Sequence, residues 1–128
     1  MLELALLSPW IIFLFVGVVD SGFYAYSLIT LETATRSAAA WNSNALTPGD
    51  ATKACTIALD EMKTLINMGG VTSCGGGSPV SVSAAQVSGP DAEPAAQVAV
   101  TYTTPQMIPI PGVLNGRFTI TRVVTMKL

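Results

Sequence analysis

The first forty residues constrain this chain more than any other stretch, because they form a long, almost uncharged and mostly apolar run. Leu4 to Val19 carries no charge, Asp20 interrupts, and Ser21 to Leu31 is again uncharged. As an α-helix, Leu4 to Leu31 would be roughly 42 Å long, more than the hydrocarbon core of a bilayer. Apolar residues occur all round its circumference, so this helix must be buried on every side. A chain of 128 residues cannot wrap its own remainder around such a rod. Burial must therefore come from a membrane, from other copies of the chain, or from each in turn.

Two acidic residues, Glu3 and Asp20, interrupt this apolar segment. A carboxylate in apolar surroundings costs several kcal/mol unless it is paired or protonated. The nearest positive charge to Glu3 is the α-amino group of Met1, and in a helical assembly the amine of a neighbour is an equally good partner. The run itself does not favour a secretory signal, because neither a basic segment before it nor a small-residue cleavage site after it is seen in this sequence. A simple membrane anchor remains open, but it gives no reason for the two acids.

The helix is expected to continue beyond the apolar run into a segment of small residues. Residues 32–40 read ETATRSAAA, in which Glu32 and Arg36 are spaced to pair weakly along a helix. The alanines favour helix and allow another element to approach closely. We therefore predict one helix that runs to about Trp41 within an N-terminal segment 1–44, with Pro9 kinking its first turns, and a globular head over residues 45–128.

Composition excludes several classes of function. Six basic residues against eight acidic ones leave no basic patch for nucleic acid. The chain has no histidine, the commonest general base and metal ligand, and no phosphate-binding motif. The sequence therefore predicts neither an enzyme, a cofactor nor a metal site. Cys55 and Cys74 are expected to form a disulfide outside the cytoplasm, the alternative being two free buried thiols.

A second, amphipathic helix is predicted after a break at residues 42–46. Thr47 is expected to cap it, with Pro48 in its first turn and Asp50 three residues after the cap. Apolar residues then recur at spacings of three and four until Gly69-Gly70 ends the helix; they are Ala51, Ala54, Cys55, Ala58, Met62, Leu65 and Ile66.

From Val80 the apolar period changes from 3.6 to 2, which indicates strands. We expect the first strand from Val80, the second over residues 95–104 and the third over residues 117–128, with a turn at residues 88–91. The fold class predicted is α+β, with an antiparallel sheet of three to four strands laid on two helices.

Two features of the last forty residues call for separate explanations. Arg122 falls on the apolar side of the third strand, so a bulge must move it out or an acid must pair with it; we predict an internal ion pair with Asp60 or Glu61, or with Glu32. The proline-rich segment 105–116 carries apolar residues that either fold back over the sheet edge or contact a neighbouring subunit. These residues are Met107, Ile108, Ile110, Val113 and Leu114.

The N-terminal motifs resemble those of TadE-like proteins, in the type IVb pilin and pseudopilin group. The motif ELALLSP at residues 3–9 is followed by the apolar run, the sequence GVVDSG at residues 17–22 ends it, and the alanine-rich segment 34–40 follows. The resemblance is specific over residues 1 to about 41. Over the head it is limited to the order of the elements, a second helix followed by strands. One departure is that Glu3 lies about two residues closer to the chain start than the corresponding glutamate of most such pilins.

The resemblance implies a filament subunit with a type IV pilin-like fold. Such proteins are made with a basic leader that a prepilin peptidase removes, wait in the inner membrane, and enter an extracellular filament with their helices at its core. It assigns assembly roles to Met1, Glu3, Pro9 and Asp20, with Glu3 neutralising a neighbour's terminal amine, and we expect the chain to be the mature form. The expected partners are copies of the chain, the pilus assembly machinery and, before assembly, the membrane. The alternative is a minor pseudopilin or membrane-held assembly factor.

Overall fold

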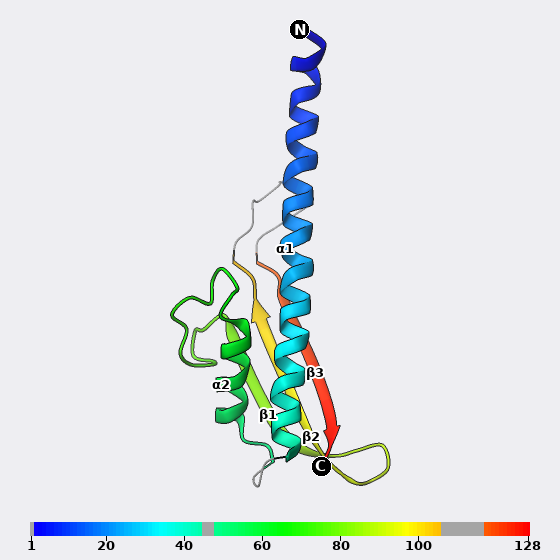
Figure 1. Cartoon of the computed structure of the whole chain (residues 1–128), viewed down its shortest axis with the longest axis vertical. Helices are drawn as coiled ribbons and strands as arrows, with labels where there is room; N and C mark the ends of the chain where they lie inside the picture. Colours follow the sequence, from blue (N-terminus) through cyan, green and yellow to red (C-terminus); the bar gives the residue numbers. More distant parts are fainter. Residues whose placement is uncertain (1, 45–47, 106–116) are drawn as a thin grey trace.

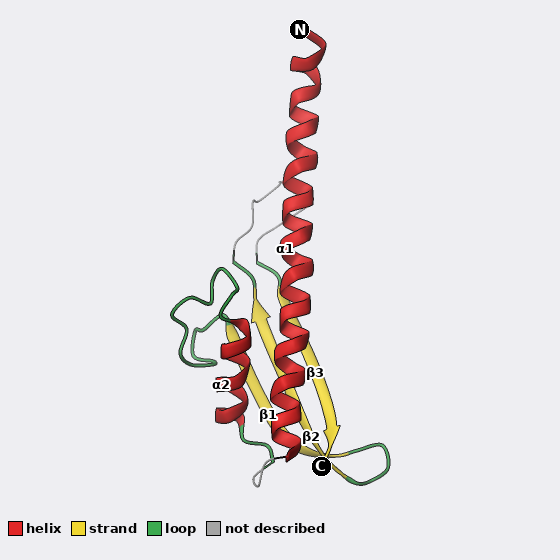
Figure 2. Cartoon of the chain, in the orientation of Figure 1, coloured by secondary structure: helices red, strands yellow, loops and turns green. Residues whose placement is uncertain are grey.

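A computed structural model describes residues 2–44, 48–105 and 117–128 of the chain. Its elements are helix α1 (Leu2–Asn44), helix α2 (Ala51–Met62) and strands β1 (Val80–Ser88), β2 (Pro94–Thr103) and β3 (Thr119–Lys127). Helix α1 runs the length of the molecule, and its second half lies with α2 over one face of the sheet (Figures 1 and 2). The predicted α+β, pilin-like fold is therefore confirmed, with three strands.

Helix α1 belongs to two environments. Its 43 residues form one uninterrupted helix that continues through Pro9. From Ser27 onward one side of it is buried against the sheet and α2, at positions spaced by one, three or four residues: Ser27, Leu31, Ala34, Thr35, Ala38, Ala39 and Asn42. Because most of these side chains are small, the helix backbone approaches the sheet closely.

Helix α2 is shorter than the sequence predicts and begins later. Asp50 is its N-cap, with Oδ1 accepting hydrogen bonds from the backbone N–H groups of Thr52 at 2.9 Å and Lys53 at 3.2 Å. The predicted cap, Thr47, lies outside the described residues. The sequence predicted the cap three residues earlier and placed Asp50 inside the helix. In the structure the side chain of Asp50 is itself the cap, because it accepts from the first free N–H groups of α2.

The chain leaves α-helical geometry after Met62, not at Gly69. Three successive turns follow, each closed by a backbone hydrogen bond over three residues, from Leu65 to Met62, from Met68 to Leu65 and from Val71 to Met68. A repeat of three brings Met62, Leu65 and Met68 to the same buried side. Ile66, which an α-helix would place on the side of Met62, is instead 77% exposed. The predicted position of Ile66 on the apolar face is therefore wrong.

The sheet is a simple antiparallel meander in the order β1-β2-β3. Val82 lies opposite Val100 and Val100 opposite Arg122, so these positions share the face that carries the helices. Helix α1 packs on β2 and β3, and α2 packs on β1 and on α1. The core lies between these layers and is centred on Tyr102, Val98, Val100 and Leu31.

The backbone pairing also fixes which groups of β3 face outward. Thr104 N–H donates to Phe118 C=O at 2.8 Å and Leu128 N–H donates to Pro94 C=O at 3.3 Å. In an antiparallel ladder the residues that exchange hydrogen bonds alternate along the strand. The even-numbered residues of β3 therefore bond to β2, and the backbone groups of the odd-numbered residues 119–127 point away from the sheet.

Candidate assembly helix

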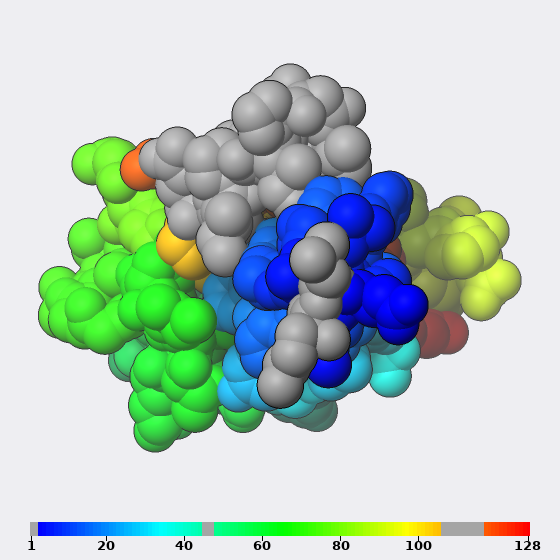
Figure 3. All heavy atoms as spheres, turned by 90° about the horizontal axis from the view of Figure 1, so that it is seen from above, coloured from blue at the N-terminus to red at the C-terminus, as the bar shows by residue number. Residues whose placement is uncertain are grey.

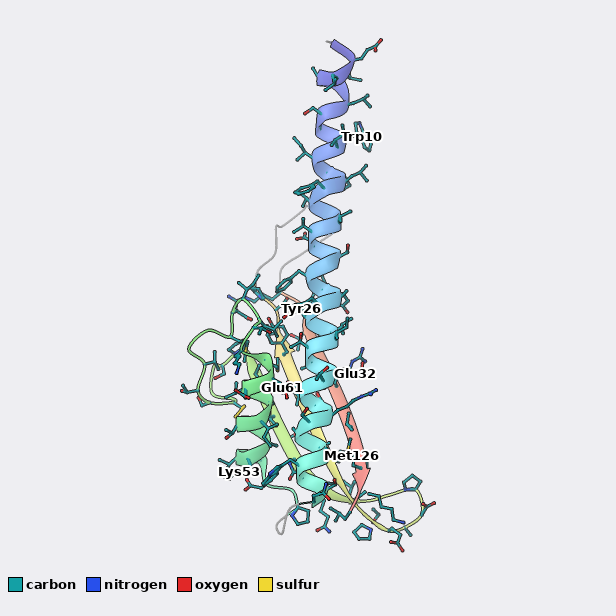
Figure 4. All side chains as sticks on the ribbon, viewed as in Figure 1. Trp10, Tyr26, Glu32, Lys53, Glu61 and Met126 are labelled. Carbon is teal, nitrogen blue, oxygen red and sulfur yellow. A yellow bond between two sulfur atoms is a disulfide. The ribbon has the colours of Figure 1, made fainter. Side chains whose placement is uncertain are left out.

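The first half of α1 projects from the head with its apolar side chains exposed. Leu4 is 71% exposed, Trp10 68% and Phe15 70%. Side chains radiate in every direction along this part of the helix, Trp10 among them (Figure 4). Viewed from the N-terminal end, the head extends to both sides of the helix (Figure 3).

This helix is long and apolar enough to cross a membrane. Its most apolar window has a mean hydropathy of 2.0, and none of that window is buried in the part of the chain that the structure describes. Eleven large apolar side chains between Leu4 and Val19 are exposed. Burying each one stabilises by about 1.5–3 kcal/mol, which gives roughly 15–30 kcal/mol for the set. Because leaving these side chains in water would forgo this free energy, we expect the segment to be covered by lipid or by protein.

The two acidic residues of the segment lie far apart. Glu3 is exposed in the first turn of α1, where a carboxylate also stabilises the partial positive charge of the helix end. Its predicted partner, the amine of Met1, lies outside the described residues. Asp20 follows 17 residues later, roughly 25 Å along the helix axis. The two carboxylates therefore cannot act on one group of the same chain.

Asp20 is half-buried, and its Oδ2 atom is inaccessible to solvent without a hydrogen-bond partner among the described residues. The hydroxyl of the neighbouring Ser21 donates to Val18 C=O at 3.0 Å and so does not serve Asp20. A buried, unpaired oxygen of a carboxyl group costs free energy, which a partner on another molecule would offset. This geometry is compatible with the assembly role expected for Asp20.

Two tyrosines join the projecting helix to the head where α1 enters it. The Tyr26 hydroxyl lies 3.0 Å from Thr64 Oγ1, and Tyr24 packs edge-on against Phe118 with ring centroids 6.1 Å apart. These contacts were not predicted from the sequence. A signal was present, since both tyrosines follow the apolar run at the point where an aromatic side chain contacts apolar and polar surroundings together.

At its other end, α1 is held to α2 by the side-chain amide of Asn42. This side chain is fully buried; its Oδ1 accepts from Gly49 N–H at 3.0 Å and Asp50 N–H at 3.1 Å, and its Nδ2 donates to Ala38 C=O at 3.2 Å. Asn42 was predicted to lie in a break between helices. It is instead a helical residue that satisfies the backbone leading into α2.

A disulfide and a buried tyrosine hold the segment between α2 and β1 to the rest of the head. Cys55 on α2 and Cys74 form a disulfide with an S–S distance of 2.05 Å. The Tyr102 hydroxyl donates to Asn67 Oδ1, and Asn67 Nδ2 donates to Thr103 C=O at 3.0 Å. Burial raises the pKa of the Tyr102 phenol, and the hydrogen bond to Asn67 offsets part of that rise.

The internal ion pair predicted for Arg122 is not found among the described residues. Arg122 is exposed, while Asp60 lies 2.9 Å from Lys63 and Glu61 accepts a hydrogen bond from Ser37 at 3.5 Å. Glu32 pairs with Arg36. The reason is topological: α2, which carries both candidate acids, packs on β1, whereas Arg122 is on β3 at the opposite edge. An edge position lets the side chain of Arg122 reach solvent without a bulge.

The predicted inter-subunit loop lies outside the described residues, including Met107, Ile108, Ile110, Val113 and Leu114. Within the described residues, no group of three or more His, Cys, Asp or Glu side chains is placed to hold a metal ion.

A long apolar helix that continues into an α+β head defines a pilin-like class of protein. Residues 1–40 match the family model described as TadE-like protein. The match confirms the predicted resemblance over the segment that carries it and relates the chain to pilus-associated proteins. No curated protein and no solved structure matches the chain.

Proposed function

We propose that this chain is the structural subunit, or major pilin, of an extracellular type IV pilus-like filament. One observation carries the proposal: the first half of α1 has apolar side chains on every side, and the described residues of its own chain leave most of them exposed. Lipid covers it before assembly, when the protein is held in the inner membrane. Copies of the same helix cover it afterwards, in the core of the filament.

The two parts of the chain take different roles in this proposal. Residues 1–44 anchor the subunit and then form the filament core, while residues 45–128 form the head on the filament surface. A prepilin peptidase prepares the chain, and the pilus assembly machinery extracts it from the membrane. The head has no role in catalysis or in binding a cofactor.

Glu3 acts in the assembly step. Its carboxylate is exposed at the end of the helix and has no basic side chain near it in sequence, since Arg36 is the first Lys or Arg of the chain. An unpaired carboxylate in lipid costs several kcal/mol. Pairing with the terminal amine of a neighbouring copy removes this cost and selects the correct axial position of the incoming subunit.

The deciding experiment is electron microscopy of material sheared from cells, with mass spectrometry of its protein bands. We expect thin filaments in which this chain predominates. Glu3→Ala should abolish them while the protein persists in the membrane fraction. Glu32→Ala is the matched control, because it removes an acid of the same helix that pairs only with Arg36 at the surface, and filaments should persist.

A chain that stays in the membrane pellet of wild-type cells would refute the filament role.

A minor pseudopilin is the second candidate, and one observation favours it: β3 presents an edge that no described residue covers, as a subunit that contacts a different protein would. In that case the chain is a trace component of the sheared fibres, yet Glu3→Ala still stops their formation.

A further inference from the structure

The outer edge of β3 is an open hydrogen-bonding surface. The strand has nine residues, contains neither proline nor glycine, and pairs with β2 without a bulge. Its outward N–H and C=O groups belong to Thr119, Thr121, Val123, Thr125 and Lys127, and no described residue pairs with them. Edges of this kind are templates for a further strand, and proteins usually shorten, bend or cover them.

The opposite edge of the sheet shows how such protection is built. At one end of β1, Gly75 N–H donates to Val80 C=O at 2.8 Å. At the other end, the backbone of Gly49 lies so close that an added Cβ atom would come within 3.4 Å of Gln86 N. Both ends of the β1 edge are therefore occupied by the chain itself, and β3 is the edge left for a partner.

The charge of the β3 edge restricts the kind of partner. Residues 94–128 contain three basic side chains, Arg117, Arg122 and Lys127, and no acidic one, in a chain of net charge −2. Lys127 lies 3.6 Å from Glu93, so it is already paired. Arg122 is exposed at the middle of the edge, on the face that carries the helices, and has no ion pair among the described residues.

We propose that β3 binds an extended segment of a different protein, which adds a fourth strand to the sheet and places a carboxylate opposite Arg122. Main-chain hydrogen bonds to the odd-numbered residues provide the affinity, and the acid selects the partner. β-Branched side chains suit the other positions of that segment, because they pair well across strands with Thr121, Val123 and Thr125.

A second copy of the chain does not fit this edge. Strand β3 runs roughly along α1 (Figure 1), so antiparallel pairing of two β3 strands would turn their membrane helices in opposite directions. Parallel pairing keeps the helices aligned, but it sets an odd-numbered residue of one β3 opposite an even-numbered residue of the other, so each Arg122 lies opposite Thr121 or Val123 and gains no carboxylate. Pairing of β3 with the β1 edge of another copy is obstructed at Gly49 and Gly75.

The test uses the full-length protein in detergent micelles and two fluorescent nine-residue peptides of alternating Val and Thr. One peptide has a central Glu and the other a central Lys, and both are N-methylated along one edge so that only the other can pair. Fluorescence anisotropy measures binding, and amide hydrogen exchange by NMR locates it. We expect the Glu peptide to bind at least tenfold more tightly and to slow exchange at least tenfold at residues 119, 121, 123 and 125.

Variants of the edge make this expectation specific. Arg122→Glu should reverse the preference, so that the Lys peptide binds more tightly. Val123→Pro removes an outward N–H without removing a β2–β3 hydrogen bond and should abolish binding, whereas Val123→Thr keeps the N–H and should retain it. A peptide N-methylated along both edges should not bind, and it serves as the control if Val123→Pro fails to fold.

Three results would overturn the proposal. The first is equal binding of the Glu and Lys peptides, or a preference that Arg122→Glu leaves unchanged. The second is that neither peptide slows amide exchange at the odd-numbered residues of β3. The third is protection of these amides by raised protein concentration alone, which would assign the edge to a second copy. None of these measurements requires a filament, so the proposal can fail while the proposed pilin role stands.

Discussion

Asn42 is expected to contribute more to the stability of the head than any exposed polar residue near it. Asn42→Ala would leave the backbone N–H groups of Gly49 and Asp50 without their acceptor. Each part-buried group left unsatisfied costs about 1–3 kcal/mol, and alanine returns about 0.5 kcal/mol of helix propensity. We therefore expect the free energy of unfolding to fall by about 1.5–5.5 kcal/mol. Urea unfolding of the full-length protein in micelles, followed by near-ultraviolet circular dichroism, measures this change.

Two companion variants make the result interpretable. Asn44→Ala removes an exposed amide that, among the described residues, donates to Ala40 C=O and to Ser43, so its effect should stay within about 0.5 kcal/mol. Asn42→Asp keeps the acceptor for both N–H groups and should cost less than Asn42→Ala. If Asn42→Ala were no more destabilising than Asn44→Ala, the assignment of Asn42 as the link between the two helices would be refuted.

Three further predictions concern the head. Cys55→Ser should destabilise it by about 3 kcal/mol, the chain-entropy value for a loop of this length, and an unchanged urea midpoint would contradict this. Tyr102→Phe should flatten the stability profile above pH 10. The raised pKa of the folded state means that the unfolded state loses the phenol proton first, so wild-type stability falls as pH rises through that range; equal profiles for both proteins would exclude this cause. Ala38→Leu should cost about 1–3 kcal/mol by overpacking a fully buried site, measured by thermal unfolding, while Ala40→Leu on the exposed side should change little.

The elements that sequence predicts well are those with one dominant period. The uncharged run dictates the exposed half of α1, and the alternation in residues 119–127 dictates β3. The turns after Met62 were not predicted because Met62 and Leu65 fall on the same side both at a repeat of three and at the α-helical repeat of 3.6 residues. The two repeats differ at Ile66, which only the α-helical repeat places on that side. Arg122 lies on the predicted face of its strand, but the predicted ion pair is not found among the described residues, because alternation gives the face of a strand and not its position in the sheet. An edge strand exposes a side chain that a central strand would bury.

The candidate site divides in the same way. Glu3 and Asp20 stand out in sequence, because a charge in an apolar run is conspicuous. Asn42 and Asn67 do not, since an asparagine is ordinary in a loop and only the folded chain shows which backbone groups its amide reaches. Long-range polar contacts such as that between Tyr26 and Thr64, 38 residues apart, have no local signature.

The continuity of α1 has a mechanical consequence. The helix that projects from the head is the same helix whose second half, from Ser27 to Asn42, lies in the core, so no flexible joint separates the two. Tension applied along the helix would act on its interface with β2 and β3 in shear, so that many contacts must slide together instead of opening one by one. In the proposed filament, a subunit pulled by the exposed half of α1 would therefore carry its head with it and transmit load without first unfolding.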